Sequence, residues 1–214
     1  MPRNNYHQEF GSFPPPFTRS PGGKRLHSWR TLILPYLDQQ SLYDSLRLNE
    51  PWNSPHNCDI AARFGDKARW VYQCPIHPKS GSDGWTDTCY VAIVGARSIW
   101  QFDEPLSYHD VVDGTSNTVS VIEIANSEIH WMEPYDREIL QMFPKIRFVR
   151  GQSTSSYHGS DGWGAPTGGS FIGKADGAVR FLPETLPDDL LKQLVTVDDG
   201  LPEEGWGDRL DRSR

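Results

Sequence analysis

One histidine and two aspartates near the C-terminal end of the chain are the side chains whose types best suit metal chemistry. His158 and Asp161 begin a glycine-rich stretch, and Asp176 follows it. Ca²⁺ prefers carboxylate and carbonyl oxygens, and a glycine-rich loop lets the backbone fold around the ion. We therefore take His158, Asp161 and Asp176 as candidate calcium ligands. The competing and favoured interpretation is that the aspartates form turns and that the chain binds no cofactor.

No other grouping of reactive side chains predicts catalysis. The seven histidines never stand at the H-x-x-x-H or H-E-x-x-H spacing of a zinc site. Ser116 lacks the second glycine of a nucleophile elbow, and we expect Asp113 and Gly114 before it to form a turn that aims the next strand. Because no nucleophile with a base and an orienting group is recognisable, the sequence predicts that the chain is not an enzyme.

Tryptophans offer a different chemistry, because aromatic side chains can form a platform on which a glycan stacks. Five of them are expected in loops, namely Trp85, Trp100, Trp131, Trp163 and Trp206. Together with loop carboxylates they would suit a carbohydrate-binding or carbohydrate-active module, which is the alternative function. Each stands alone in its segment, so burial as a core or loop anchor is the favoured use.

Net charge narrows the range of partners. The value of −7 disfavours nucleic acid and anionic membrane surfaces, because both are bound through lysine and arginine. The basic residues near the start, Arg19, Lys24, Arg25 and Arg30, are scattered, and we interpret them as part of a solvated surface.

Export and membrane signals are also missing from the sequence as it stands. No apolar stretch reaches the roughly 20 residues that cross a bilayer, and the polar, proline-rich start does not read as a secretory signal. Taken alone, the chain would stay in the cytoplasm.

The chain has three cysteines, Cys58, Cys74 and Cys89, and an odd number cannot all pair within the chain. One disulfide among them would fit an exported protein, and the sequence does not say which.

The N-terminal segment, residues 1–25, is expected to be a helix end followed by an extended path. Residues 3–10 read as the last turns of a helix that Gly11 ends. Pro14 to Pro16 then force the chain into an extended conformation. Because a helix with so little apolar surface is not stable alone, we interpret it as the remnant of a longer helix.

Residues 29–48 carry the clearest helical pattern. Ser28 is the expected N-cap, and Pro35 predicts a kink or two abutting helices. Ser41 is expected to cap the second of them. The stretch from Asn49 to Asn57 is dense in turn-forming residues and reads as a loop.

Strands are predicted from Trp70 onward. Residues 70–72 and 89–94 are short β-type runs, and 118–124 is apolar on both faces, which is typical of a central strand. Residues 169–182 read as a hairpin, in which Asp176-Gly177 tolerates the positive φ angles of a type I′ turn.

Two expectations concern side chains on these strands. Alternation along the hairpin predicts that Phe171 and Phe181 both face the core. Glu123 is expected either at a strand end or buried with a partner, for which Arg180 is the candidate, because a buried carboxylate needs a cation or hydrogen bonds. We interpret this pair as structural.

Helices first, strands next and a closing helix predict an α+β fold with a largely antiparallel sheet. The closing helix is expected at 187–196, with three leucines on one face. Residues 26–198 form the predicted α+β domain. Residues 199–214 are an acidic tail that is expected to be flexible.

Blocks spread in order over nearly the whole chain resemble one family. They are Asn4 to His7, Gly11 to Pro15, His27 to Arg30, Leu34 to Leu37, Leu42-Tyr43, Glu50 to Asn57, Cys74-Pro75, Asp113 to Thr118, Glu123, Trp131, Glu133-Pro134 and Asp176 to Phe181. The chain resembles a large group of planctomycete prepilin-like proteins of unknown function, often labelled by a C-terminal motif of His, nine residues and Asp-Gly. Here seventeen residues separate His158 from Asp176, because Gly159 to Gly169 is inserted. The positions that carry the resemblance are Trp29, Pro35, Trp52, Asp113, Gly114, Asn117, Glu123, Asp176 and Gly177.

The resemblance implies a pilin-like head, in which a sheet packs on the second half of a long N-terminal helix. The apolar, membrane-embedded first half and its processing site are missing from this chain. The implied function is a non-catalytic structural or display role in a surface or secretion-type assembly, with protein partners or self-assembly. Attachment to a membrane, and a location in the cell envelope or outside the cytoplasm, are expected only for a form that has this anchor.

Overall fold

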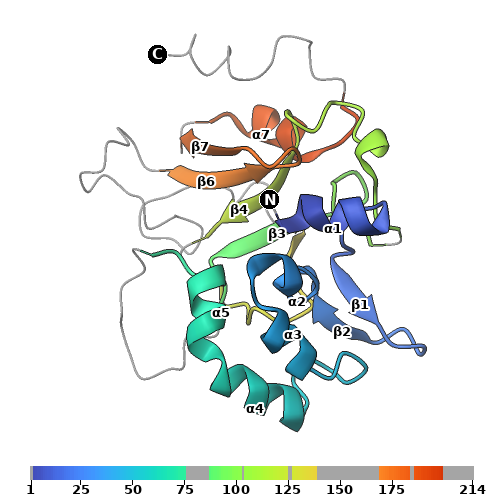
Figure 1. The fold of residues 1–214 in the computed structure, drawn as a ribbon. Coiled ribbons are helices and arrows are strands. Elements are labelled where there is room, and N and C mark those ends of the chain that lie inside the picture. The colour runs from blue at the N-terminus through green and yellow to red at the C-terminus, as the bar shows by residue number, and fades with distance from the viewer. Residues whose placement is uncertain are drawn as a thin grey trace.

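The computed structural model describes residues 2–75, 87–102, 104–124, 127–138, 169–183 and 186–199. Figure 1 shows a sheet that has α7 (Asp188–Val195) on one side and the N-terminal helices on the other. The predicted α+β class is confirmed, as is the largely antiparallel sheet. The tail predicted at residues 199–214 lies almost wholly outside the described residues, so the domain limits stay a prediction.

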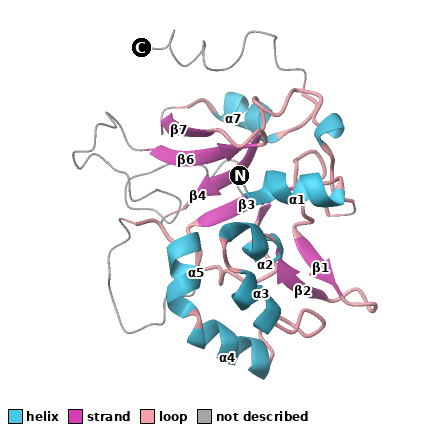
Figure 2. Ribbon diagram, viewed as in Figure 1, coloured by secondary structure: helices cyan, strands magenta, loops and turns pink. Residues whose placement is uncertain are grey.

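Figure 2 distinguishes the helices from the strands, and the two types alternate little along the chain. The remaining helices are α1 (Pro2–Phe10), α2 (Trp29–Leu32), η1 (Leu34–Leu37), α3 (Gln40–Ser45), α4 (Pro55–Arg63), α5 (Gly65–Tyr72) and η2 (Tyr108–Asp110). The strands are β1 (Phe17–Arg19), β2 (Arg25–Ser28), β3 (Tyr90–Val94), β4 (Val119–Glu123), β5 (Arg137–Glu138), β6 (Gly169–Lys174) and β7 (Val179–Pro183).

The helices up to residue 48 agree with the sequence except in their caps. α1 ends at Phe10, directly before Gly11, whose φ of 75° suits glycine. η1 begins at Leu34, directly before Pro35 and close to the end of α2, so two abutting helices are confirmed. Ser28 stands at the N-cap of α2, but its hydroxyl donates to the Trp131 carbonyl at 2.7 Å instead. The prediction that Ser41 caps the next helix is wrong, because α3 already begins at Gln40.

Two segments are helical where the sequence indicated a loop and a strand. The expected loop ends early, because Ser54 caps α4 by accepting a hydrogen bond from the Asn57 amide. The strand expected at 70–72 is wrong, because these residues complete α5. Ala68 and Tyr72 are buried one helical turn apart while Trp70 between them is 86% exposed. Burial at a spacing of four residues indicates a helix, whereas a strand would alternate by two.

A five-stranded sheet in the described residues has the order β5-β3-β4-β6-β7. β3 and β5 are parallel and the other neighbours are antiparallel. β4 lies in the middle and is mostly buried, so the predicted central strand at 118–124 is confirmed, as is the strand at 89–94. On one face, α7 packs Leu191 and Leu194 against the apolar side chains of the central strands.

The hairpin of β6 and β7 forms as expected, but with another turn. Gly177 has a φ of 98° and its amide donates to the Lys174 carbonyl at 3.0 Å. A type I′ turn would also need a positive φ at Asp176, which is not observed, so that prediction is wrong. Phe171 and Phe181 do share a face, with ring centroids 5.3 Å apart.

The face that these two rings share is not the core face, so that part of the prediction is wrong. Phe171 is 37% exposed, whereas Ile172 and Leu182, which point the other way, are buried against α7. Because side chains alternate along a strand, the two phenylalanines must lie on the face opposite Ile172 and Leu182, which is the face that α7 does not cover.

Gly177→Val tests the hairpin as a structural centre of the C-terminal half. A β-branched residue resists a φ of 98°, so we expect a loss of about 1–3 kcal/mol in the free energy of unfolding. Chemical denaturation measures the loss. Ala178→Val introduces the same side chain one residue later, and it should change the midpoint much less. Equal midpoints for wild type and Gly177→Val would contradict the account.

Candidate functional site

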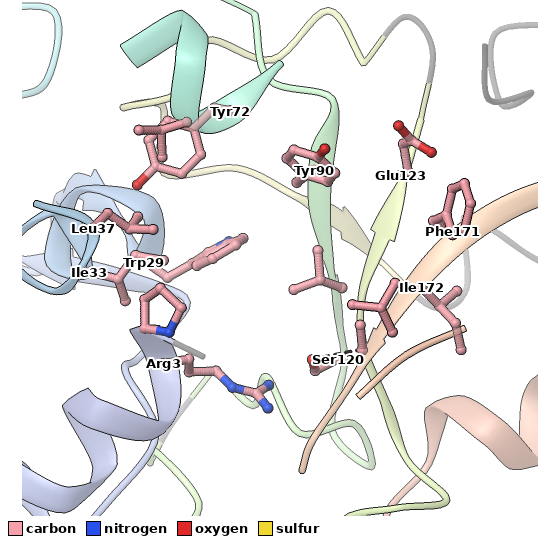
Figure 3. A pocket seen from close by; sticks show the side chains of 15 residues that line it. Arg3, Trp29, Ile33, Leu37, Tyr72, Tyr90, Ser120, Glu123, Phe171 and Ile172 are labelled. Atoms are coloured by element: carbon pink, nitrogen blue, oxygen red, sulfur yellow. Dashed lines mark hydrogen bonds between the residues drawn. The ribbon is translucent and has the colours of Figure 1, made fainter. Parts of the chain in front are cut away.

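An apolar groove, here called the sheet groove, lies on the face of the sheet opposite α7. Its volume is about 260 Å³. Figure 3 shows one wall formed by α2, η1 and α5, a floor formed by the strands, and Arg3 of α1 at one end. The residues that line the wall and the end are Pro2, Arg3, Trp29, Ile33, Leu37, Val71 and Tyr72, and the residues that form the floor are Tyr90, Ser120, Val121, Glu123, Phe171, Ile172, Gly173 and Val179.

The floor follows from the strand register. Tyr90 lies opposite Glu123, and Val121 lies opposite Gly173, on the face turned away from α7. Gly173 in turn lies opposite Val179. Because Gly173 has no side chain, the floor is low between Val121 and Val179. Val179 is 52% exposed, so the groove is open toward β7, the edge strand.

Arg3 closes one end of the sheet groove and fixes α1 to the hairpin. Its side chain is buried, and Nη2 donates to the Ala175 carbonyl at 2.7 Å. Its guanidinium lies over the Phe13 ring, 4.6 Å from the centroid, and near Trp100. Burial lowers the pKa of Arg3 to about 10, so it keeps its charge at neutral pH. The first turn of α1 is therefore held against the sheet.

A buried ion pair stands behind the wall. Arg30 Nη1 lies 2.7 Å from Asp136 Oδ1, and both side chains are almost completely buried. The guanidinium also donates to the carbonyls of Trp131 and Tyr90. The carboxylate accepts from the Ala92 amide at 2.8 Å. Burial raises the pKa of the Asp136 carboxyl, and the Arg30 charge and these donors oppose the rise.

The two residues of this ion pair also form hydrogen bonds with three aromatic residues that line the sheet groove. Trp29 Nε1 donates to Asp136 Oδ2 at 3.2 Å. The Tyr72 hydroxyl donates to the Arg30 carbonyl at 2.5 Å. Tyr90 is held through its own carbonyl, which accepts from the guanidinium. The wall and the floor are thus tied to one buried centre.

The polar groups inside the groove favour binding over acid–base chemistry. Burial raises the pKa of Tyr72 and of Tyr90, and the Glu123 carboxylate raises that of Tyr90 further, so both phenols are protonated at neutral pH. Glu123 itself is 2% exposed and faces Tyr90 across the strands. The arrangement is a mainly apolar cleft with a few hydroxyl groups and one carboxylate.

Of the three candidate calcium ligands, the structure describes Asp176 alone. Asp176 is a turn residue, since its Oδ1 accepts from the Ala178 amide at 2.8 Å. His158 and Asp161 lie outside the described residues. Within the described ranges, no three His, Cys, Asp or Glu side chains gather as a metal site would require.

The residues that carry the family resemblance fall into two groups. Trp29 and Glu123 line the sheet groove. The others shape turns and helix ends: Pro35 in η1, Trp52 beside His130, the turn of Asp113, Gly114 and Asn117, and the hairpin turn of Asp176 and Gly177.

The turn at Asp113 aims the next strand, as the sequence indicated. Asn117 Nδ2 donates to the Asp113 carbonyl at 2.8 Å, and Gly114 adopts a φ of 87°. Asp113 Oδ2 accepts from the Asp199 amide at 2.7 Å, which ties the end of the described chain to this turn.

Two of the five tryptophans that were expected in loops lie within the described residues. Trp100 and Trp131 are buried, which confirms their use as anchors, while Trp85, Trp163 and Trp206 lie outside the described residues.

Arg180 does not lie where a partner of Glu123 would. It lies opposite Ile172 in the register, on the other face of the sheet, and donates to the Val179 carbonyl.

The buried pair of Arg30 and Asp136 was missed by sequence reasoning. The expectation that Arg30 is solvated is wrong, because its exposure is 0%. Arg25 also differs from a purely solvated cation, since it lies 4.1 Å from the Phe17 ring centroid. No local pattern marks the pair, because 106 residues separate Arg30 from Asp136 in the sequence.

Comparison with known proteins gives one match. A family model described as "Protein of unknown function (DUF1559)" matches residues 3–142. No curated protein matches the chain, and no solved structure matches it. In the part of the chain that the structure describes, no helix combines the length and apolarity that crossing a bilayer requires.

Arg30→Met tests the buried ion pair of Arg30 and Asp136. The change would leave the Asp136 carboxylate buried without its cation, so we expect a loss of about 3–5 kcal/mol in the free energy of unfolding. The double variant Arg30→Met/Asp136→Leu should recover part of this loss. Arg97→Met, which removes an exposed arginine paired with Asp198, should leave the denaturation midpoint almost unchanged. Equal midpoints for Arg30→Met and Arg97→Met would contradict the assignment.

Proposed function

We propose that this chain, which belongs to the family described as "Protein of unknown function (DUF1559)", is a non-catalytic pilin-like head. It has a structural or display role in a surface or secretion-type assembly at the cell envelope, as the resemblance to planctomycete prepilin-like proteins suggests. The observation that carries the proposal is the place of α1, whose first residues, Pro2 and Arg3, form one end of the sheet groove.

A helix that continued α1 before Pro2 would have the sheet groove within reach. In Figure 1 the N-terminal end of α1 lies over the middle of the sheet, near β4. Arg3 anchors this end to the Ala175 carbonyl, so the direction of approach is fixed. Pro2 would kink such a helix, as proline does within a helix, and so let it change direction at the groove.

Apolar side chains on the open side of the groove offer a surface to this helix. Phe171 is 37% exposed and Val179 is 52% exposed. Exposed apolar groups that cluster around a cleft mark interaction surfaces more often than isolated ones do. An apolar helix laid on the floor would bury Phe171 and Val179 from water.

Partners and location follow from this assignment. An apolar helix upstream of residue 1 would be the only attachment to a membrane, and the head would then lie in the envelope or outside the cytoplasm. Self-assembly, or binding to other proteins of the same assembly, is the proposed mode of action, without nucleic acid. Calcium at His158, Asp161 and Asp176 stays a secondary proposal, and the head itself needs no cofactor.

Fusion of an apolar helix upstream of Pro2 tests the proposal. A fused helix that reaches the groove should add about 1–3 kcal/mol to the free energy of unfolding, because it buries Phe171 and Val179. Chemical denaturation measures the gain. The matched control joins the same helix through a Gly/Ser spacer that breaks its continuity with α1. Val179→Lys should abolish the gain, whereas Arg180→Glu on the opposite face should not. A gain that is unaffected by Val179→Lys would count against the groove as the binding surface.

Activity assays test the absence of catalysis. A panel of glycoside, ester and peptide substrates should turn over no faster in the presence of the protein than in buffer, because no set of nucleophile, base and orienting group is recognisable in the sequence. Turnover that is lost on a single change, such as Glu123→Gln or Ser116→Ala, would overturn this part of the proposal.

A further inference from the structure

The segment that follows α5 runs beside the start of β3. The Cys89 amide donates to the Tyr72 carbonyl at 2.7 Å. Gln73 Nε2 donates to the Asp87 carbonyl at 3.3 Å. These contacts bring two cysteines that are fifteen positions apart in the sequence, Cys74 and Cys89, to neighbouring positions. Both are buried, with exposures of 3% and 2%.

The two cysteines are in direct contact. The Cys89 thiol accepts a hydrogen bond from the Cys74 backbone amide. The Cys74 sulfur is only a few covalent bonds from that amide nitrogen, so rotation about its Cα–Cβ bond can carry it toward the Cys89 sulfur. A disulfide needs Cβ atoms about 3.5–4.5 Å apart, a separation that this contact is suited to reach. All three cysteines are in the thiol form in this structure, and the third, Cys58, is exposed on α4.

We propose that Cys74 and Cys89 are a disulfide site. In the reaction the two thiols lose two protons and two electrons and form one S–S bond. The oxidant is the disulfide of a thiol–disulfide exchange partner, such as oxidised glutathione or an oxidoreductase, which is reduced to two thiols. The inference goes beyond the proposed function and does not depend on it, although an oxidising compartment would favour the bond.

The bond would join the wall of the sheet groove to its floor. Cys74 lies two residues after Tyr72, the last residue of α5, and Cys89 directly precedes Tyr90, the first residue of β3. Both tyrosines line the groove. Oxidation would therefore restrain the distance between α5 and the sheet, whereas reduction would leave that distance to hydrogen bonds and packing alone.

The burial of the site also predicts when the bond forms. Burial raises the pKa of the Cys89 thiol to about 11, so at neutral pH almost none of it is the thiolate that attacks a disulfide. We expect oxidation of the folded protein to be slow and to become faster as pH rises. Oxidation during refolding, before the core closes, should be faster.

The experiment uses the Cys58→Ser variant of the full chain, refolded in a buffer of oxidised and reduced glutathione. Peptide mass spectrometry after alkylation should find Cys74 and Cys89 joined, and Tm should rise by about 5–10 °C over the same protein treated with reductant. Cys58→Ser/Cys74→Ala and Cys58→Ser/Cys89→Ala should show no redox-dependent change in Tm, which controls for effects of the buffer.

Two results would overturn the proposal. One is full alkylation of Cys74 and Cys89 after refolding under oxidising conditions that leave the Cys58→Ser protein folded by circular dichroism. The other is a crosslink with no rise in Tm, because a bond that strains the fold is not a native site. Neither result bears on the helix-fusion experiment, so the disulfide and the pilin-like role can fail separately.

Discussion

The buried ion pair of Arg30 and Asp136 is the interaction on which the rest of this structure depends. Removing two charges from water costs several kcal/mol for each ion, and this cost is offset only if the remaining donors and acceptors are satisfied. Here the guanidinium donates to four backbone carbonyls, and the carboxylate accepts from the Ala92 amide and the Trp29 ring. The pair fixes the relative positions of α2, β3 and the segment that leads into β5.

This constraint explains why one face of the sheet is closed and the other is only partly covered. α7 packs directly on the first face, where Leu191 and Leu194 complete an apolar layer. The second face is covered by short helices, which the ion pair of Arg30 and Asp136 holds in place, so these helices pack on β3 and β4. β6 and β7 extend beyond their reach, which leaves Phe171 and Val179 exposed at the edge of the sheet groove. The functional proposal rests on this asymmetry.

Local patterns in the sequence predicted those parts of the fold that depend on near neighbours. The hairpin turn follows from the glycine at 177, and the central strand follows from a run that is apolar on both faces. The segment 70–72 was misjudged because its three apolar residues suit a strand, while the helical spacing that buries Tyr72 is visible only with the residues before it. Burial of Arg30 depends on Asp136, over a hundred residues away, so no local pattern could reveal it. The sheet groove depends on strand register and was equally out of reach.

Amide hydrogen exchange near the buried pair tests the central claim most directly. The Ala92 amide donates to Asp136 Oδ1, so its protection reports on the ion pair, whereas the Ile122 amide lies in the covered middle of the sheet. If the pair supports the whole head, both amides should exchange only through global unfolding, with the same free energy of opening and the same dependence on denaturant. An Ala92 amide that exchanges through a local opening, well below the free energy found for Ile122, would contradict the account.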